Sequence, residues 1–410
     1  MNSKLKTFYK VIMAVILTAI ITVIITTAVV VKNHEVFKNK FYSETLKTVA
    51  DGEFNFDELK ALIRSEFLFD IDEEKLREGV IKGYVAGLGD EYSEYFTKEE
   101  MEDFEEETSG RFVGIGIYLA NDKETNSIII IGIIKGNSAE EHGIQAGDII
   151  KSVNGVEYTG EELEEAVSNI KGEENTTVDI VIIRDGEELN FTLERRFVDV
   201  PSVASKVLDN YKNIGYVAVA SFDEDTSEEF KKEVDKLIEE NDIKGLIIDL
   251  RSNGGGIVTE ATNIADYFLE PEEIIISTKS KKQEKESRII AKETPIYEDI
   301  QVVILVNEYT ASASEILAAA LKENDKATIV GITTYGKGLI QTLFKLQDGS
   351  GLKITTAEYY TPDHNLINEI GVSPDIEIDL TKDKNGKYET EETNDAQLLK
   401  AVEEINKLIK

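Results

Sequence analysis

The longest uninterrupted apolar run lies near the start of the chain. Residues 11–31 (VIMAVILTAIITVIITTAVVV) carry no charge over 21 positions. As a helix the run would be about 31 Å long, which is enough to cross a bilayer. Lys4, Lys6 and Lys10 precede it, and no small-residue cleavage site follows it. The pattern favours an uncleaved anchor over a cleaved signal peptide. It predicts a cytoplasmic tail at residues 1–10, one transmembrane pass, and an extracytoplasmic remainder.

Apolar residues three and four positions apart predict helices in the next part of the chain, residues 32–100. The first helix is expected around residues 59–67 and the second over about 72–88. Gly89 follows the second helix as a typical C-terminal cap. The dense acidic run at 98–107 is most simply a solvated helix or loop.

The pattern changes after about residue 110 to short strands and turns, and from residue 214 to alternating strands and helices. This alternation is typical of a layered α/β domain with parallel strand pairing. Residues 277–293 form a charged insertion between apolar strands, which predicts an exposed hairpin. The end of the chain, 381–410, is expected to be a polar loop followed by an amphipathic helix. The predicted core strands are 214–220, 245–250, 302–306 and 328–332, and the predicted core helices are 227–240, 257–269 and 313–323.

Composition narrows the classes of function. The 410 residues include 45 Lys and Arg against 80 Asp and Glu, a formal net charge of −35. A chain this acidic is unsuited to nucleic acid, whose phosphates need a basic surface. A single membrane-spanning run excludes a many-pass transporter. The absence of cysteine excludes disulfides, thiolate metal sites and a cysteine nucleophile. No cluster of His, Asp and Glu has metal-ligand spacing, so neither a metal nor another cofactor is expected.

The segment from Phe112 to Ile117 reads FVGIGI, in which small and apolar residues alternate. Close glycines let a backbone approach a ligand, and such a nest of N–H groups holds a terminal carboxylate while a sheet edge takes up the peptide as a strand. The blocks GIQAGDII (143–150) and VNG (153–155) follow. Together these segments resemble the bacterial PDZ pattern and place a mainly-β PDZ domain over 101–197. A PDZ fold that binds nothing is the alternative. The candidate peptide contacts are Gly114, Ile115, Gly116 and Ile117.

Ser312 lies where an apolar strand meets a helix, in the segment NEYTASASEI at 307–316. A hydroxyl at such a junction is exposed beside helix N–H groups, which can stabilise an oxyanion. On this segment alone, a helix cap at Ser312 or Ser314 is the simpler interpretation.

Two glycine-rich segments carry further chemistry. Lys337 lies between glycines in YGKGLIQ at 335–341, just past another apolar strand. A serine hydroxyl needs a base, and a lysine can serve only when it is neutral, which burial favours. A surface lysine in a glycine turn is the commoner case. The segment DLRSNGGG at 249–256 joins a strand to a helix, and its N–H groups suit an oxyanion hole or a phosphate cradle.

These three segments, in this order after a PDZ module, resemble the C-terminal processing peptidases, also called tail-specific proteases. The resemblance covers nearly all of the chain after about residue 40, including the LGDEYSEYF block at 88–96. It implies an α/β protease core over 198–380, similar to the Clp protease and crotonase fold, with the PDZ domain inserted before it. The implied catalytic residues are Ser312 as nucleophile, Lys337 as general base and Gln341 as the residue that orients the lysine. The implied oxyanion-hole donors are the backbone N–H groups of Gly254 or Gly255 and of Ala313.

The resemblance also implies partners. A membrane-anchored serine endopeptidase at a bacterial cell surface would act on proteins or peptides with apolar C-terminal tails, without a cofactor. Residues 55–70 and 395–410 resemble family segments used in dimer contacts, so a homodimer is expected.

Other classes of protein fit the sequence less well. The segment from Gly331 to Lys337 fits a phosphate-binding loop, but Gly338 stands where that loop needs a serine or threonine. A histidine triad would have to use His34, His142 or His364, none of which has comparable motif support. A catalytically silent membrane-anchored PDZ scaffold that binds protein C-termini is the alternative outside enzymes.

Overall fold

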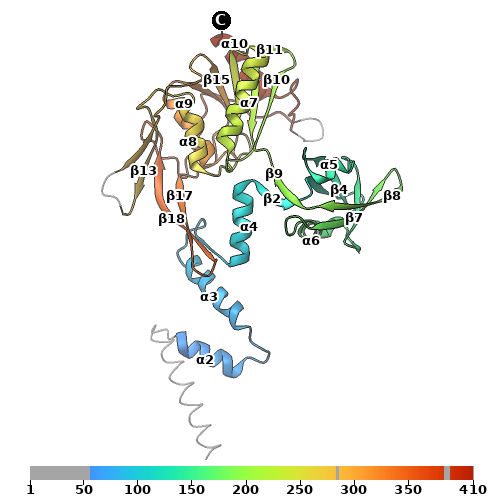
Figure 1. Ribbon diagram of the computed structural model, residues 1–410. Helices are drawn as coiled ribbons and strands as arrows, with labels where there is room; N and C mark the ends of the chain where they lie inside the picture. The colour runs from blue at the N-terminus through green and yellow to red at the C-terminus, as the bar shows by residue number, and fades with distance from the viewer. Residues whose placement is uncertain (1–55, 283–285, 383–387, 410) are drawn as a thin grey trace, which may run out of the picture. The chain divides into compact units, whose positions relative to one another are not determined.

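The computed structural model describes residues 56–282, 286–382 and 388–409 (Figure 1). The chain divides into two units, with the boundary between Val80 and Ile81. The expected helices of the N-terminal region are present as α2 (Phe56–Glu66) and α3 (Glu73–Ala86). The predicted anchor at 11–31 lies outside the described residues. Among the described helices, none has both the length and the apolar character needed to cross a membrane.

A six-stranded sheet forms the centre of the α/β core, in the order β10-β11-β12-β15-β16-β19. β10 and β11 are antiparallel, and every later neighbour pair is parallel. The four predicted core strands are all present close to their expected ends, because strands buried on both faces read as continuous apolar runs. The strands are β10 (Val203–Leu208), β11 (Tyr211–Val219), β12 (Gly245–Asp249), β15 (Gln301–Val306), β16 (Ala327–Gly331) and β19 (Ile376–Glu377).

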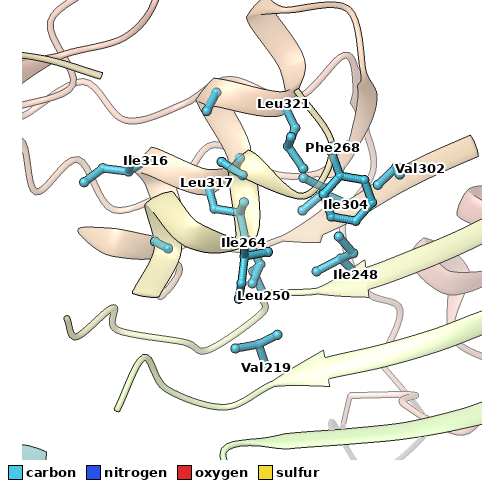
Figure 2. Close-up of a cluster of buried hydrophobic side chains, with 14 of the residues drawn as sticks. Val219, Ile248, Leu250, Ile264, Phe268, Val302, Ile304, Ile316, Leu317 and Leu321 are labelled. Carbon is cyan, nitrogen blue, oxygen red and sulfur yellow. The ribbon is translucent and has the colours of Figure 1, made fainter. Parts of the chain in front are cut away.

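Helices cover both faces of this sheet. α7 (Thr226–Asn241), α8 (Val258–Asp266) and α9 (Ala313–Glu323) pack on one face, and α10 (Ala396–Leu408) packs on the other. Figure 2 shows the first layer, where Ile248 and Ile304 of the sheet meet Ile264 and Leu317 of the helices and Phe268 of the turn after α8. Their strand neighbours Ile247 and Val303 instead join the cluster under α10. Burying a side chain of this size contributes about 2 kcal/mol.

A second sheet is organised around β18 (Gly351–Tyr360). β17 (Leu339–Lys345) pairs with one edge of β18, and β1 (Glu94–Phe96) and β13 (Ile274–Ser280) share the other. β14 (Ser287–Ile290) returns antiparallel to β13, so the hairpin predicted in the charged insertion is confirmed. A strand from the N-terminal region therefore lies beside β18, which is more than 200 residues later in the chain.

The predicted PDZ segment folds around its own apolar core. Its sheet has the order β3-β4-β5-β7-β8, so β3 is an edge strand, and β6 pairs with β5. A capping box between Thr159 and Glu162 begins the short turn η1 (Gly160–Glu162), and α6 follows. The elements are β3 (Ile117–Asp122), β4 (Ser127–Ile133), α5 (Ser138–Glu141), β5 (Ile149–Val153), β6 (Val156–Glu157), α6 (Leu163–Ile170), β7 (Thr177–Arg184) and β8 (Glu187–Glu194).

A two-stranded stem joins this module to the rest of the chain. β2 (Arg111–Gly114) enters the module and β9 (Arg196–Asp199) leaves it, paired antiparallel. At the base of the stem the Val200 N–H donates to the Gly110 carbonyl at 3.0 Å. The module is therefore an insertion whose two ends are adjacent.

The acidic run becomes the helix α4 (Lys98–Ser109), so the helical alternative is correct. A capping box between Thr97 and Glu100 begins it. The helix is not simply solvated, because Met101 is 2% exposed and Phe104 stacks on Phe96, with 5.0 Å between ring centroids.

Candidate active site

Ser312 occupies a tight turn between β15 and α9. Its backbone has φ 56° and ψ −116°, a conformation that residues with a side chain rarely adopt. The turn is held by the Ala311 N–H, which donates to the Asn253 carbonyl at 3.0 Å, and by the Thr310 hydroxyl, which donates to the Leu250 carbonyl at 2.8 Å. The Ser314 hydroxyl is fully buried and donates to the same Asn253 carbonyl. Ser314 therefore supports the turn, whereas Ser312 forms the capping box of α9 with Glu315, as the simpler interpretation of the sequence predicted.

The carboxylate of Glu315, which is 0% exposed, joins the turn of Ser312 to the loop of Lys337. It accepts hydrogen bonds from the backbone N–H groups of Ser312 at 2.8 Å, Gly336 at 2.8 Å and Lys337 at 2.9 Å. The Thr334 hydroxyl donates to it at 2.5 Å. A buried carboxylate needs such donors, and hydrogen bonds to an ionised group are roughly twice as strong as neutral ones. Glu315 therefore fixes the distance between the two loops.

Tyr359 makes a second connection between the same loops. Its buried phenol donates to the Lys337 carbonyl and interacts with the Ser312 side chain. Burial, with the nearby Glu315 carboxylate, raises the pKa of Tyr359 well above its usual range, so the phenol stays neutral. Tyr359 was not predicted from the sequence, because it belongs to none of the motifs.

Lys337 is partly withdrawn from water. Burial and the neighbouring charge of Lys353 lower its pKa, while the carboxylates of Glu315 and Glu91 oppose that shift. Its Nζ lies 4.8 Å from the centroid of the Tyr92 ring. Within the described part of the chain, Nζ makes no hydrogen bond to the Ser312 hydroxyl. The two side chains are thus brought to one site without being bonded to each other.

Gln341 lies on β17, where its side-chain amide donates to the Thr355 hydroxyl at 3.2 Å. No hydrogen bond between Gln341 and Lys337 occurs among the described residues. Thr355 also donates its backbone N–H to the Ser93 hydroxyl at 3.1 Å. Gln341 and the turn that carries Tyr92 are therefore anchored at one position of β18.

The structure distinguishes the two candidate oxyanion glycines. The Gly255 N–H already donates to the Asn253 side chain at 2.8 Å. The N–H groups of Gly254 and Ala313 have no acceptor among the residues that the structure describes. A Cβ on Gly255, whose φ is +101°, would lie 2.7 Å from the Ser312 Cβ, whereas one on Gly254 would meet nothing within 4 Å. Gly255 is therefore needed for close packing, and Gly254 is the more available donor.

A buried ionic cluster supports the glycine-rich turn. Arg251 bonds to Asp249 at 2.6 Å and reaches Asp395, ahead of α10, at 2.8 Å. The Tyr216 hydroxyl donates to Asp249 at 2.6 Å, and the Gln397 side-chain oxygen Oε1 accepts from Arg251 at 3.1 Å. These charges hold the C-terminal helix against the strand that leads into the turn.

The PDZ segment has a groove of 280 Å³ between β3 and α6. Ile115, Gly116 and Ile117 line it, and Gly114 is at the end of the stem beside it. The N–H groups of Ile115 and Gly116 have no acceptor within the described ranges. Gly116 has φ +81°, and a Cβ there would lie 2.3 Å from the Cβ of Asn137. The nest thus requires glycine, as the spacing indicated. The other residues lining the groove are Phe112, Tyr118, Leu119, Leu163, Val167, Ile170 and Lys171.

Metal chemistry finds no support at either location. Among the described residues no group of three or more His, Cys, Asp or Glu side chains could hold an ion.

Comparison with known proteins places the chain among proteases. The sequence profile of peptidase family S41 matches residues 213–378, that of the PDZ domain matches 103–183, and that of the activating protease CtpB N-terminal domain matches 24–100. A CtpA-like serine protease of Staphylococcus aureus (strain COL) is 35% identical over 356 residues, covering 87% of this chain and 71% of the relative. The carboxy-terminal processing protease CtpA of Bacillus subtilis (strain 168) is 36% identical over 338 residues, covering 82% and 71%.

A solved S41 protease structure from Bacteroides fragilis has the same fold. It superposes with a TM-score of 0.52 at 16% identity, covering 85% of this chain and 96% of that one.

Proposed function

The chain belongs to peptidase family S41, the family of C-terminal processing proteases, and we propose that it is a membrane-anchored serine endopeptidase that cleaves proteins outside the cytoplasm. The observation that carries the catalytic assignment is the double connection between the turn of Ser312 and the loop of Lys337, through Glu315 and Tyr359. Two loops joined this closely keep a nucleophile and a base within reach of one another.

In the proposed reaction the neutral amine of Lys337 takes the proton of the Ser312 hydroxyl as Oγ attacks the scissile carbonyl carbon. The N–H groups of Gly254 and Ala313 stabilise the tetrahedral oxyanion. The intermediate collapses as the lysine returns the proton to the leaving amine. Water then attacks the acyl-enzyme, with the same lysine as base, and restores Ser312.

The PDZ module would bind the substrate's C-terminal tail. A peptide would add to the free edge of β3, with its carboxylate at the nest of Ile115 and Gly116 and an apolar side chain in the groove against Leu163 and Val167. Residues 11–31 would anchor the enzyme in the membrane, and a homodimer is part of the proposal.

The test compares cleavage of an unfolded protein by the purified full-length wild type, Ser312→Ala and Lys337→Ala. Cleavage by the wild type alone supports the proposal. Equal cleavage by all three assigns the activity to another site or a contaminant. If none cleaves, apolar-tailed peptides are added: activity that then appears in the wild type alone indicates a latent protease, and tail binding without cleavage indicates a scaffold.

Tail recognition has its own prediction. Amidating the C-terminus of an apolar peptide removes the negative charge that the nest would hold, so we expect its affinity to fall about tenfold, measured by calorimetry with Ser312→Ala. The control is the same peptide with a free carboxylate and Val167→Asp in the groove, which should also weaken binding. Equal affinity for acid and amide would exclude the carboxylate role of the nest.

A further inference from the structure

The side chain of Lys337 has a neighbour that no motif assigns a role. Its Nζ lies 4.8 Å from the centroid of the Tyr92 ring, within the range over which an aromatic face attracts a cation. We propose that Tyr92 is a positioning residue for the general base, whose ring face holds the Lys337 amine at a resting position beside Ser312. The inference rests on the proposed function, because it assumes that Lys337 is the base.

The turn that carries Tyr92 is built to hold the ring in place. The Asp90 carboxylate accepts hydrogen bonds from the Tyr92 N–H at 3.3 Å and from the Ser93 hydroxyl. The Ser93 hydroxyl in turn accepts the Thr355 N–H at 3.1 Å. Since Thr355 also accepts from Gln341, the ring and the catalytic strand pair share one support.

Lys337 Nζ lies over the ring of Tyr92. Burial, and then the neighbouring Glu91 and Tyr335 side chains, raise the pKa of the Tyr92 phenol, so it remains neutral. The part of Tyr92 that meets Nζ is therefore the ring face. A phenylalanine would keep that face, whereas a leucine would keep similar bulk and lose it.

Charged side chains of both signs act on the Lys337 amine in addition to the Tyr92 ring. The Lys353 ammonium repels the charge of Lys337, while the Glu315 and Glu91 carboxylates favour it. An aromatic face favours the ammonium form as well. Removing the face should make Lys337 easier to deprotonate. The titratable groups around the amine are Glu315 from α9, Lys353 and Tyr359 from β18, Glu91 and Tyr92 from the turn, and Tyr335 from the lysine's own loop.

The experiment measures the titration of Lys337 without requiring activity. Full-length Ser312→Ala protein, with Tyr92, Tyr92→Phe or Tyr92→Leu, is labelled with trace acetic anhydride across pH, and the peptide containing residue 337 is quantified by mass spectrometry. We expect the midpoint to fall by about half a pH unit in Tyr92→Leu and to stay in place in Tyr92→Phe. The acid limb of kcat/KM, measured with Ser312 restored, should move by the same amount.

Lys326 provides an internal reference. Burial also lowers its pKa, but it lies at the start of β16 and contacts the Glu298 carbonyl. The pH midpoint for labelling of Lys326 should be equal in all three proteins, and this equality would show that the fold is intact. An unchanged Lys337 midpoint in Tyr92→Leu, or an equal shift in both variants, overturns the role of the ring face. Failure of the proposed protease shows separately, as cleavage that does not depend on Ser312 or Lys337.

Discussion

At the scale of single residues, the site depends on which polar groups are already occupied. Ser312 is held with φ 56° although it carries a side chain, at a cost of about 1–3 kcal/mol, whereas the Ser314 hydroxyl is bonded to the Asn253 carbonyl. The Gly255 N–H donates to the Asn253 side chain, whereas the Gly254 N–H has no acceptor among the described residues. The groups available for catalysis are therefore identified by the hydrogen bonds that their neighbours already make, rather than by residue type alone.

The pH dependence of cleavage follows from the state of Lys337. Burial, and then Lys353, set the pKa of this lysine below its usual value of about 10.5, and the base is active only when neutral. Activity should therefore rise with pH as the lysine loses its proton, with the midpoint of that rise below the pKa of a free lysine. The measurement is kcat/KM between about pH 5 and about pH 9 on a peptide that does not titrate in that range. A flat profile would contradict the dyad.

At the scale of elements, buried side chains combine the loops after β15 and β16 with strand β18 into one site. Glu315 lies in the first turn of α9, and its carboxylate accepts hydrogen bonds from backbone N–H groups of the loop after β16. The apolar runs of the core strands were sufficient to predict the sheet, and the segment around Ser312 was sufficient to predict a junction between a strand and a helix. Tyr92 and Tyr359 could not be predicted, because their contacts with Lys337 depend on how β1, β17 and β18 pair.

The role of Gln341 also depends on strand pairing. The register of β17 shifts between Ile340 and Gln341, which sets Gln341 opposite Thr355. The family resemblance identified the residue, but only the register shows which side chain it meets. Its proposed action on Lys337 remains a prediction.

Replacing the Glu315 carboxylate should separate the two loops. In Glu315→Gln an amide NH2 faces some of the four donors that the carboxylate now accepts, so we expect a loss of about 2–4 kcal/mol in the free energy of unfolding. Urea unfolding measures the loss, and kcat should fall by at least about tenfold with little change in KM. Glu308→Gln is the matched control, since Glu308 is exposed three residues before the turn. Equal stability of the two variants would refute the connecting role.

At the scale of the whole molecule, distant segments of sequence support one catalytic edge. Arg251 near the oxyanion turn is bonded to Asp395, which also caps α10 through the Leu398 N–H at 2.9 Å. The last helix of the chain therefore stabilises the turn that would bind the oxyanion. Composition and periodicity predicted that helix, but not its ionic contact with Arg251, because the two residues are 144 positions apart.

Removing the Asp395 side chain tests that support. In Asp395→Ala a buried guanidinium loses one of its two carboxylates and α10 loses its cap, so the free energy of unfolding should fall by about 3 kcal/mol. Thermal and urea unfolding measure the change. Glu403→Gln on the same helix breaks only exposed ion pairs and should cost far less, because solvent screens such pairs. If the two variants lose the same amount, the buried cluster contributes no special stability.

The adjacent ends of the PDZ insertion have a consequence for how such enzymes diversify. Gly110 and Val200 are already hydrogen-bonded neighbours, so the flanking chain follows the same path whatever is inserted between them. A shorter link or a foreign binding domain could occupy this position at little entropic cost. Recombination at this point could exchange the recognition module while leaving the hydrolytic machinery untouched, and a protein engineer could use the same junction to make cleavage respond to a chosen ligand.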